Sequence, residues 1–300
     1  MKGWLVNDTL TCIPGTKTFW HDLLEWFPDL QDKTNSYTDF SILASQTEKE
    51  ISLFGKPDYI IRNATFFRSI EAEGLKTISL IQDFFEGPIR LEQLKVANKS
   101  DIVVFNSESL KKRYERDIAP WVKIKTIPLG VDFDFFSPVE DKIQLLPDSI
   151  LYVGDSTNYP KGFDRIMNLI NTTSFNFCLV MKDDFNFIHD RVTIFNKIDH
   201  SLLRKVYNSC SLLVCSSREE TLHLAGVEAA ACGLPIVATD VGVYKGMSSG
   251  PWGEKVKDLD FESSIRKVMQ SKYNPREFFL NMKLDKESCK KEWRELIYER

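Results

Sequence analysis

Two glutamates, Glu220 and Glu228, stand eight residues apart and form the strongest chemical feature of this sequence. The first follows a short apolar run and a serine-containing loop. The second lies among alanines, which favour a helix. A carboxylate among small apolar neighbours needs hydrogen-bond donors, because a buried unpaired charge is costly. The two adjacent hydroxyls of a ribose would supply such donors to the two oxygens of Glu228.

The elements around the glutamates predict where a ligand would lie. Leu212–Cys215 and Ile236–Thr239 read as strands, and a helix is expected between them, with Thr221 as its N-cap and Gly233 just past its end. The carboxyl ends of parallel strands and the positive end of a helix both favour a bound phosphate. We therefore predict a nucleoside diphosphate lying across Thr221–Leu224, with its ribose on the second glutamate.

Two glutamates at this spacing are a weak signal in a chain with 43 acidic residues, and two solvated surface acids are the competing interpretation. The complete string LLVCSSREETLHLAGVEAAACGLPIVATD is more specific. It resembles the two-glutamate region of the retaining, family-4-like glycosyltransferases of the GT-B fold (glycosyl transferases group 1). The resemblance implies that Glu220 lies by the donor sugar and phosphate, and that Glu228 binds the ribose.

Strand-then-helix alternation over 300 residues predicts an α/β protein with more than one domain. The resemblance implies a GT-B architecture, in which two Rossmann-like parallel-sheet domains face each other across a cleft. The boundaries that we expect are an acceptor-side domain at 1–138, a linker at 139–149, a nucleotide-sugar-binding domain at 150–284, and a C-terminal helix at 285–300 that crosses back to the first domain.

The hydrophobic patterns predict further elements. Strands are expected at Gly3–Val6, Ser41–Ala44, Tyr59–Arg62, Thr77–Ile81, Ile102–Phe105, Ile124–Ile127, Ile150–Val153, Phe177–Met181 and Val192–Phe195. Helices are expected at Thr16–Phe27, Glu48–Phe54, Thr65–Glu73, Leu91–Lys99, Ser109–Arg116, Leu202–Tyr207, Phe261–Met269, Glu277–Met282 and Glu287–Tyr298.

The first half of the chain offers two candidate site residues. Gly15 lies in a Pro14–Gly15 turn after the first strand, where backbone N–H groups can approach a phosphate; a plain tight turn is an equally good interpretation. Gln82 ends the stretch TISLIQ, at the position where the family places a histidine that approaches the donor sugar. A glutamine can hydrogen-bond a sugar hydroxyl but cannot carry a proton. The alternative for Gln82 is a polar strand end that faces solvent.

The second half adds candidates for the diphosphate and the base. In the family, the first turn of this domain holds an arginine and a lysine that meet the donor pyrophosphate. Here Lys161 is present and Asp155 stands at the arginine position. Lysine alone is a competent point-charge partner for phosphate. The resemblance also places the nucleotide base at the turn that ends in Ile198.

The helix start departs from the family pattern as well. Relatives usually read Glu-Gly-Phe-Gly-Leu, whereas this chain continues from the first glutamate with Thr221, Leu222, His223 and Leu224. The missing glycines narrow the backbone's freedom to approach a phosphate. His223 could instead offer a ring N–H to the phosphate, and a structural histidine is the competing interpretation.

Composition narrows the class of protein. The net charge of −4 gives no global basic field for nucleic acid, and no run of about 20 apolar residues predicts a spanning helix. We expect a cytoplasmic protein with buried free cysteines. The basic segment at 109–125, which contains Trp121, would suit peripheral contact with anionic headgroups, whereas a solvated helix face is the alternative.

The predicted function is transfer of a sugar from a nucleotide-sugar to an acceptor hydroxyl with retention at the anomeric carbon, in glycan or glycoconjugate synthesis. The acceptor would be a glycan, a lipid-linked sugar or a small molecule. We expect no metal and no cofactor. The alternatives are a catalytically silent GT-B protein that binds a nucleotide or glycan, and a glucosyltransferase of DNA bases, which the acidic charge disfavours.

Overall fold

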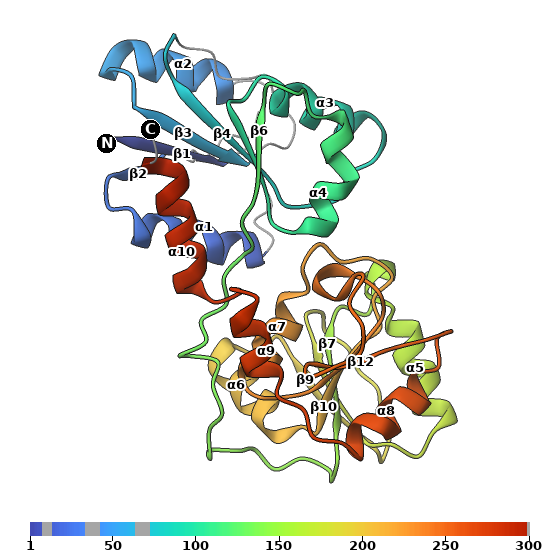
Figure 1. Cartoon of the computed structure of the whole chain (residues 1–300). Coiled ribbons are helices and arrows are strands. Elements are labelled where there is room, and N and C mark those ends of the chain that lie inside the picture. Colours follow the sequence, from blue (N-terminus) through green and yellow to red (C-terminus); the bar gives the residue numbers. More distant parts are fainter. Residues whose placement is uncertain (8–13, 34–42, 64–72, 299–300) are drawn as a thin grey trace. The chain divides into compact units, whose positions relative to one another are not determined.

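The computed structural model describes residues 1–7, 14–33, 43–63 and 73–298, which fall into two compact units (Figure 1). The first unit consists of Met1–Leu129 with Cys289–Arg300, and the second of Gly130–Ser288. Each contains one six-stranded parallel sheet with helices against it. The α/β prediction and the two Rossmann-like sheets are therefore confirmed, and the cleft implied by the resemblance stays a prediction.

The sheet of the first unit has the strand order β2-β1-β3-β4-β5-β6. Its strands are β1 (Gly3–Asn7), β2 (Leu30–Asp32), β3 (Tyr59–Asn63), β4 (Lys76–Ile81), β5 (Ile102–Phe105) and β6 (Lys123–Thr126). The helices of this unit are α1 (Pro14–Trp26), α2 (Leu43–Phe54), α3 (Gly87–Ala97), α4 (Glu108–Tyr114) and α10 (Lys286–Tyr298).

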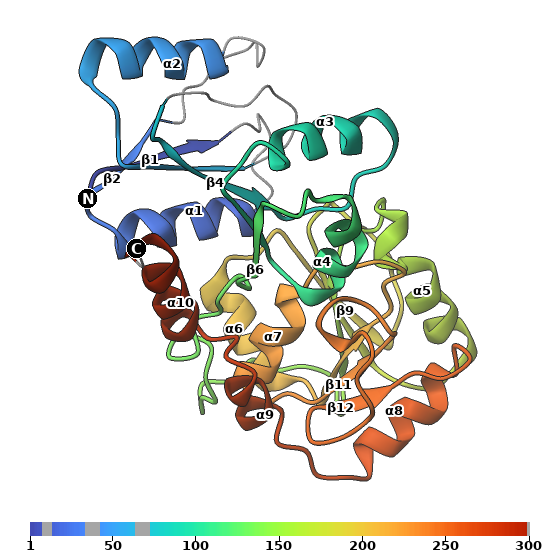
Figure 2. The ribbon, with the colours of Figure 1, turned by 45° about the horizontal axis from the view of Figure 1, so that its top comes forward.

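The two faces of this sheet are covered by different helices. Register places Trp4, Ile60 and Val103 on one face, where α2, α3 and α4 pack (Figure 2). Helix α10 comes from the far end of the sequence and packs beside α1, with the rings of Phe19 and Trp293 5.8 Å apart. Both helices therefore close the opposite face of the first sheet.

The sheet of the second unit has the order β12-β11-β10-β7-β8-β9, in which the first strand along the chain lies at the centre. Its strands are β7 (Ile150–Gly154), β8 (Phe177–Met181), β9 (Val192–Asn196), β10 (Leu212–Cys215), β11 (Ile236–Ala238) and β12 (Gly253–Lys255). This is the doubly wound order of dinucleotide-binding domains, whose strand order reverses between β7 and β10. Ligands bind such sheets outside the carboxyl ends of the two strands at the reversal.

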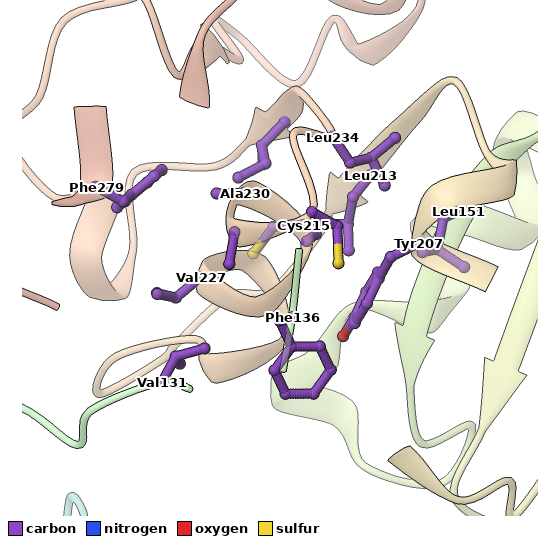
Figure 3. Close-up of a cluster of buried hydrophobic side chains, with 14 of the residues drawn as sticks. Val131, Phe136, Leu151, Tyr207, Leu213, Cys215, Val227, Ala230, Leu234 and Phe279 are labelled. Atoms are coloured by element: carbon purple, nitrogen blue, oxygen red, sulfur yellow. The ribbon is translucent and has the colours of Figure 1, made fainter. Parts of the chain in front are cut away.

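Five helices cover the second sheet. They are α5 (Phe163–Thr172), α6 (His200–Ser209), α7 (Leu224–Ala231), α8 (Phe261–Met269) and α9 (Pro275–Asn281). Helices α5 and α8 share one apolar cluster with the sheet, and α6, α7 and α9 share the other. Figure 3 shows the second cluster, in which Val227 and Ala230 of α7 lie between Phe279 and the sheet residues Leu213 and Cys215.

The segment predicted as a linker packs on the second unit. The Val139 N–H donates to Asn208 Oδ1 over 2.9 Å, and the Ile143 N–H donates to Ser209 Oγ over 2.9 Å. Arg276 of α9 binds the carbonyl oxygens of Phe133 and Phe136, each over 3.0 Å. These contacts explain why the second unit begins at Gly130.

Three local predictions are wrong, and one cannot be compared. Leu43 and Ala44 belong to helix α2 rather than to a strand at Ser41–Ala44. Pro14 and Gly15 form the first turn of α1 rather than a loop before it, since proline suits the first helical position. Helix α7 begins at Leu224 with His223 as its N-cap, so Thr221 is not the cap. The helix expected at Thr65–Glu73 lies almost wholly outside the described residues.

Candidate functional site

The candidate site lies where the strand order of the second sheet reverses. Lys161 follows β7 in a single 3-10 turn, Tyr159–Lys161, and Glu220 follows β10 in the loop that leads to α7. The two strands are direct neighbours, with Leu212 paired to Ile150. Their carboxyl ends therefore bring the two residues to one edge of the sheet, as a phosphate site in a doubly wound fold requires.

The loops after β7 and β10 are bonded to each other along their length. The Ser216 hydroxyl donates to the carbonyl oxygen of Gly162 over 3.0 Å, and Arg165 Nη1 donates to the carbonyl oxygen of Ser216 over 2.8 Å. Gly162 has φ +67°, and a Cβ there would lie 2.1 Å from that Ser216 oxygen. Only glycine permits both this backbone conformation and this approach.

Arg218 fastens the turn that carries Lys161. Its backbone N–H donates to the Pro160 carbonyl oxygen over 2.7 Å. Its guanidinium binds both carboxylate oxygens of Asp164, each over 2.7 Å, and lies 3.9 Å from the centre of the Tyr159 ring. A bidentate pair of this kind fixes geometry as well as charge. Arg218 thus holds the lysine turn against the loop of the first glutamate.

Lys161 and Glu220 meet directly. Lys161 Nζ lies 2.8 Å from Glu220 Oε1, and the Ser217 hydroxyl donates to the same oxygen over 2.8 Å. The side chain of Glu220 is only 8% exposed and that of Lys161 is 34% exposed, so the carboxylate is shielded from water and the lysine only partly. Oε1 is occupied by two donors, whereas no described residue donates to Oε2. The second oxygen is therefore the one available to a sugar hydroxyl.

Electrostatics keep Glu220 ionised. Burial alone would raise its pKa, but His223, Lys161 and Ser217 together lower the pKa below its usual value. His223 carries no charge at neutral pH, since burial lowers its own pKa to about 4, so the stabilising charge there comes from Lys161. Glu220 is consequently a carboxylate at neutral pH, suited to orient a group and to favour positive charge nearby.

Helix α7 presents an uncapped amino end beside this pair. Its N-cap, His223, adopts the left-handed conformation with φ +72° and makes no side-chain cap. Within the described part of the chain, the N–H groups of Leu224 and Ala225 have no acceptor, while those of Gly226 and Val227 point to the His223 carbonyl oxygen. Free N–H groups at a helix start form a ready site for an anion.

The other predicted residues of this stretch have structural partners. Leu222 is buried and its carbonyl oxygen accepts from the Val243 N–H over 3.0 Å. Thr221 is half-buried and has an interaction partner. His223 is 8% exposed, and its Nδ1 lies 3.0 Å from the Tyr244 hydroxyl. These positions shape the loop between Glu220 and the helix.

Glu228 lies one turn into α7, on the side that meets α6. The Tyr207 hydroxyl donates to Glu228 Oε2 over 2.8 Å. Burial raises the pKa of Glu228, against the opposing effects of Tyr207 and His200. Tyr207 is the single donor that the described residues supply to this half-buried side chain, so Oε1 is left open to a ligand. A ligand with adjacent hydroxyls would complete it.

Two candidates lie elsewhere in the sheets. Ile198 follows β9 and packs half-buried against the apolar cluster that holds α7. Gln82 belongs to the first unit, directly after β4, and is 3% exposed, with its backbone carbonyl oxygen accepting from Asn106 Nδ2 over 2.9 Å. The solvent-facing alternative for Gln82 is therefore wrong. The ligand roles of Gly15, Gln82 and Ile198 stay predictions.

Asp155, which stands at the family's arginine position, closes its own turn. Its Oδ1 accepts from the Thr157 N–H over 2.9 Å and from the Thr157 hydroxyl over 2.7 Å. The next residue, Ser156, donates its N–H to Asp183 Oδ1 over 3.0 Å. The substitution thus rigidifies the loop after β7 and brings no cation to it.

The basic segment at 109–125 belongs to the first unit and is partly paired. Lys111 lies 3.4 Å from Glu108, and Arg113 binds Glu86. Trp121 is 78% exposed. The segment therefore combines local ion pairs with one prominent aromatic ring.

Three features of the described residues bear on other kinds of chemistry. Their cysteines are all free thiols. They contain no group of three or more His, Cys, Asp or Glu placed to hold a metal ion. None of their helices has the length and apolarity needed to span a bilayer. The prediction that the reaction needs no metal stays a prediction.

Sequence reasoning missed four supporting residues: Ser217, Arg218, Tyr207 and Tyr244. A glutamate among the small apolar residues of α7 demands a donor, so the sequence indicated the need for a residue such as Tyr207 but not its identity. Arg218 is the one cation in the Ser216–Glu220 loop, which was a usable signal. Tyr244 reaches its partner only through the tertiary fold, and no local pattern points to it.

Comparison with known proteins agrees with this geometry. Residues 148–270 match the family model described as glycosyl transferases group 1. No curated protein sequence matches the chain.

Solved structures match over nearly the whole chain. Sucrose-phosphate synthase from Thermosynechococcus elongatus has a TM-score of 0.77 at 14% identity, covering 99% of this chain and 98% of that one. HepE from Anabaena in complex with UDP-glucose has a TM-score of 0.76 at 12% identity, covering 99% of both chains. A glycosyltransferase from Rickettsia africae has a TM-score of 0.73 at 14% identity, covering 100% of this chain and 99% of that one. These likenesses establish the GT-B fold.

Proposed function

Because the chain belongs, through its second unit, to the glycosyl transferases group 1 family and has the GT-B fold, we propose that it transfers a sugar from a nucleotide-sugar to an acceptor hydroxyl with retention at the anomeric carbon. One observation carries the proposal. Lys161 and Glu220 meet over 2.8 Å beside the uncapped start of α7, at the strand reversal of the second sheet.

The donor diphosphate would lie over the start of α7. Lys161 and the N–H groups of Leu224 and Ala225 supply positive charge there, where the leaving diphosphate develops negative charge. The crystal structures of Anabaena HepE with UDP and with UDP-glucose support a nucleotide-sugar as the class of donor. Glu228, which receives one protein donor on Oε2, would accept from the ribose hydroxyls.

The chemical step would break the bond between the anomeric carbon and the diphosphate oxygen, and would form a bond from that carbon to the acceptor oxygen. The acceptor's proton goes to the leaving diphosphate. Glu220 Oε2 orients the sugar through a hydroxyl and favours the positive charge that develops on the ring. Neither Glu220 nor Lys161 changes covalently in this scheme.

Binding and turnover by the purified protein test the proposal. We expect a rise in melting temperature with one of UDP-glucose, GDP-mannose or ADP-glucose, because a ligand of the native state stabilises it. Release of the nucleoside diphosphate from the donor that binds, followed by mass spectrometry, reports transfer or hydrolysis. No melting shift with any nucleotide-sugar, at millimolar concentration and at neutral pH, would contradict the proposal.

A silent nucleotide-binding protein is the second candidate, and Asp155 favours it. That residue closes its turn in place of a second phosphate cation, and Gln82 stands where the family places a histidine. Turnover discriminates between the two candidates. A silent protein binds the nucleotide-sugar and leaves it intact over a day of incubation, whereas the enzyme releases the diphosphate.

The acceptor would be a glycan, a lipid-linked sugar or a small molecule. For a lipid-linked acceptor, the basic segment at 109–125 with exposed Trp121 would touch anionic headgroups. Co-sedimentation with vesicles of phosphatidylglycerol and phosphatidylcholine tests this contact. Replacing Trp121 by alanine, together with Lys112, Lys123 and Lys125 by glutamine, should lower the fraction of protein bound to the vesicles. An unchanged fraction would contradict the membrane contact.

A further inference from the structure

His223 and Tyr244 form a buried pair next to Glu220. His223 Nδ1 and the Tyr244 hydroxyl are 3.0 Å apart, and the two ring centres are 5.6 Å apart at an interplanar angle of 61°. The Tyr244 ring stacks on Trp252, with 5.1 Å between centres, and meets Phe279 edge-on at 6.4 Å. The tyrosine is thus fixed by packing on the side away from the histidine.

The backbone around the pair is built to admit it. A Cβ on Gly226 would lie 1.8 Å from the Tyr244 oxygen and 2.5 Å from His223 Nδ1. Gly242, with φ +54°, lets the loop of Tyr244 approach, because a Cβ there would lie 2.8 Å from the Leu222 carbonyl oxygen. His223 itself is held at φ +72°, a conformation that non-glycine residues seldom adopt. Three unusual local features therefore converge on one hydrogen bond.

The direction of that hydrogen bond follows from what each partner can do. The Tyr244 hydroxyl is buried, and its pKa is raised well above the ordinary value by burial and by nearby Cys215 and Glu220, so the phenol keeps its proton. Among the described residues, His223 Nδ1 is the acceptor within its reach. A buried hydroxyl without an acceptor is costly, so the phenol donates to Nδ1. The ring proton of neutral His223 then sits on Nε2.

The charged groups facing His223 leave it neutral. Burial lowers its pKa to about 4; Glu220 raises the pKa and Lys161 lowers it, and Tyr244 contributes no charge. Within the part of the chain that the structure describes, Nε2–H has no acceptor. His223 occupies the N-cap position of α7, where the first N–H groups, on Leu224 and Ala225, are also free of acceptors among the described residues. Nε2–H is therefore a donor open to solvent or to a ligand.

We propose that Tyr244 is a positioning residue, which holds the neutral ring of His223 so that Nε2–H donates to a diphosphate oxygen of the nucleotide-sugar. The inference rests on the proposed function, and it assigns to this pair the role left open by the missing arginine and glycines. A neutral donor adds directional hydrogen bonding without a second charge beside Lys161.

The test is a double-mutant cycle on diphosphate binding. The variants are Tyr244→Phe, which keeps the packed ring, and His223→Gly, which suits φ +72°, together with their combination. The probes are inorganic pyrophosphate and UDP, GDP or ADP, measured by calorimetry at pH 7. We expect each single variant to weaken binding by about tenfold, as for one hydrogen bond to a charged group, and the combination to lose no more than His223→Gly alone. Tyr273→Phe, which removes a tyrosine hydroxyl that binds Glu254, is the matched control.

Nitrogen-15 NMR of the imidazole rings gives a readout that does not depend on ligand or activity. The chain has only 4 histidines, and His223→Gly identifies the signal of interest. We expect His223 to carry its proton on Nε2 and to show no titration between pH 5 and 8, and Tyr244→Phe to mix the two tautomers.

The outcomes separate the inference from the proposed function. Binding of a nucleotide by wild type, with Tyr244→Phe binding equally well, overturns the inference and leaves the function standing. Additive losses in the combined variant, or a proton on Nδ1 of His223, also overturn the inference. Absence of any nucleotide or pyrophosphate binding by wild type overturns the proposed function, and the inference falls with it.

Discussion

The two glutamates of the second unit have the same side chain and opposite environments. Glu220 stands in a loop, receives Lys161 and Ser217 on one oxygen, and has a lowered pKa. Glu228 stands in a helix, receives Tyr207 alone, and has a pKa raised by burial. Glu220 is a carboxylate that protein donors already orient and keep ionised. The second is an acceptor left incomplete, which is what a binding site for hydroxyl groups requires.

Glu220→Gln removes the negative charge of this carboxylate and should have the largest effect on turnover. It removes the ion pair with Lys161 and the negative charge near the sugar, while the start of α7 stays intact. We expect the rate of donor turnover to fall about 100- to 1000-fold, a typical loss for preorganised electrostatics, with little change in nucleotide affinity. Initial rates and calorimetry measure the two quantities. Glu219→Gln, one residue earlier and exposed, is the control. An equal loss of turnover in this variant would contradict a specific role for the Glu220 carboxylate.

The pH dependence of the unfolding free energy tests whether the histidine beside Glu220 is buried and neutral. His223 has a folded-state pKa of about 4, below its ordinary value, so the unfolded chain binds more protons between the two pKa values. The stability that His223 contributes is present above about pH 6.5 and is lost as the pH falls toward 4, by about 3 kcal/mol in total. Urea unfolding of wild type and His223→Asn across this range should show the difference. If the unfolding free energies of the two proteins changed with pH in parallel, His223 would not be a buried neutral histidine.

Glu228→Gln tests the incomplete acceptor. We expect nucleotide affinity to fall by about 1.5–3 kcal/mol, as for hydrogen bonds to a charged group, with a smaller effect on the turnover of saturated enzyme. Calorimetry with the nucleoside diphosphate measures the affinity. The same variant should not lose stability above neutral pH, because a carboxyl with a raised pKa destabilises the fold as the pH rises through that value. Loss of stability with unchanged affinity would make Glu228 a structural residue.

Arg218→Lys should have the smallest effect of the four. A lysine cannot make the bidentate pair with Asp164 or stack on Tyr159, so the turn of Lys161 loosens without losing its charge. We expect turnover to fall about tenfold, roughly 1.4 kcal/mol, with a small drop in melting temperature. Arg266→Lys is the matched control. In the wild type, the guanidinium of Arg266 in α8 binds Glu262 and lies over the ring of Phe175. Equal effects of the two substitutions on turnover would exclude positioning.

Much of the fold was predictable because its strands are short apolar runs with sharp ends. β5, β8 and β10 have the residues that the pattern predicts. The strand predicted at Ser41–Ala44 is wrong, since an apolar run of three residues fits the start of a helix equally well. β12, Gly253–Lys255, has only three residues and polar side chains, so its strand character comes from pairing with β11.

The candidate site was predictable where chemistry and spacing coincide and not where partners come from distant loops. Lys161 and Glu220 were both named from the sequence, but their contact over 2.8 Å depends on the pairing of β7 with β10. The N-cap was placed two residues early, because Thr221 is a good cap by type while the tertiary fold puts His223 at the cap in a left-handed conformation. The pairing with Tyr244 shows why that costly conformation persists.

The central claim is that Glu228 grips the ribose of a nucleoside diphosphate, and substrate and protein can be changed together to test it. The measurement is the Kd of the nucleoside diphosphate that binds, and of its 2′,3′-dideoxy form, for wild type and Glu228→Gln. The account predicts that removing the two hydroxyls weakens binding to wild type by about tenfold or more and barely changes binding to Glu228→Gln. An equal penalty in both proteins would contradict it.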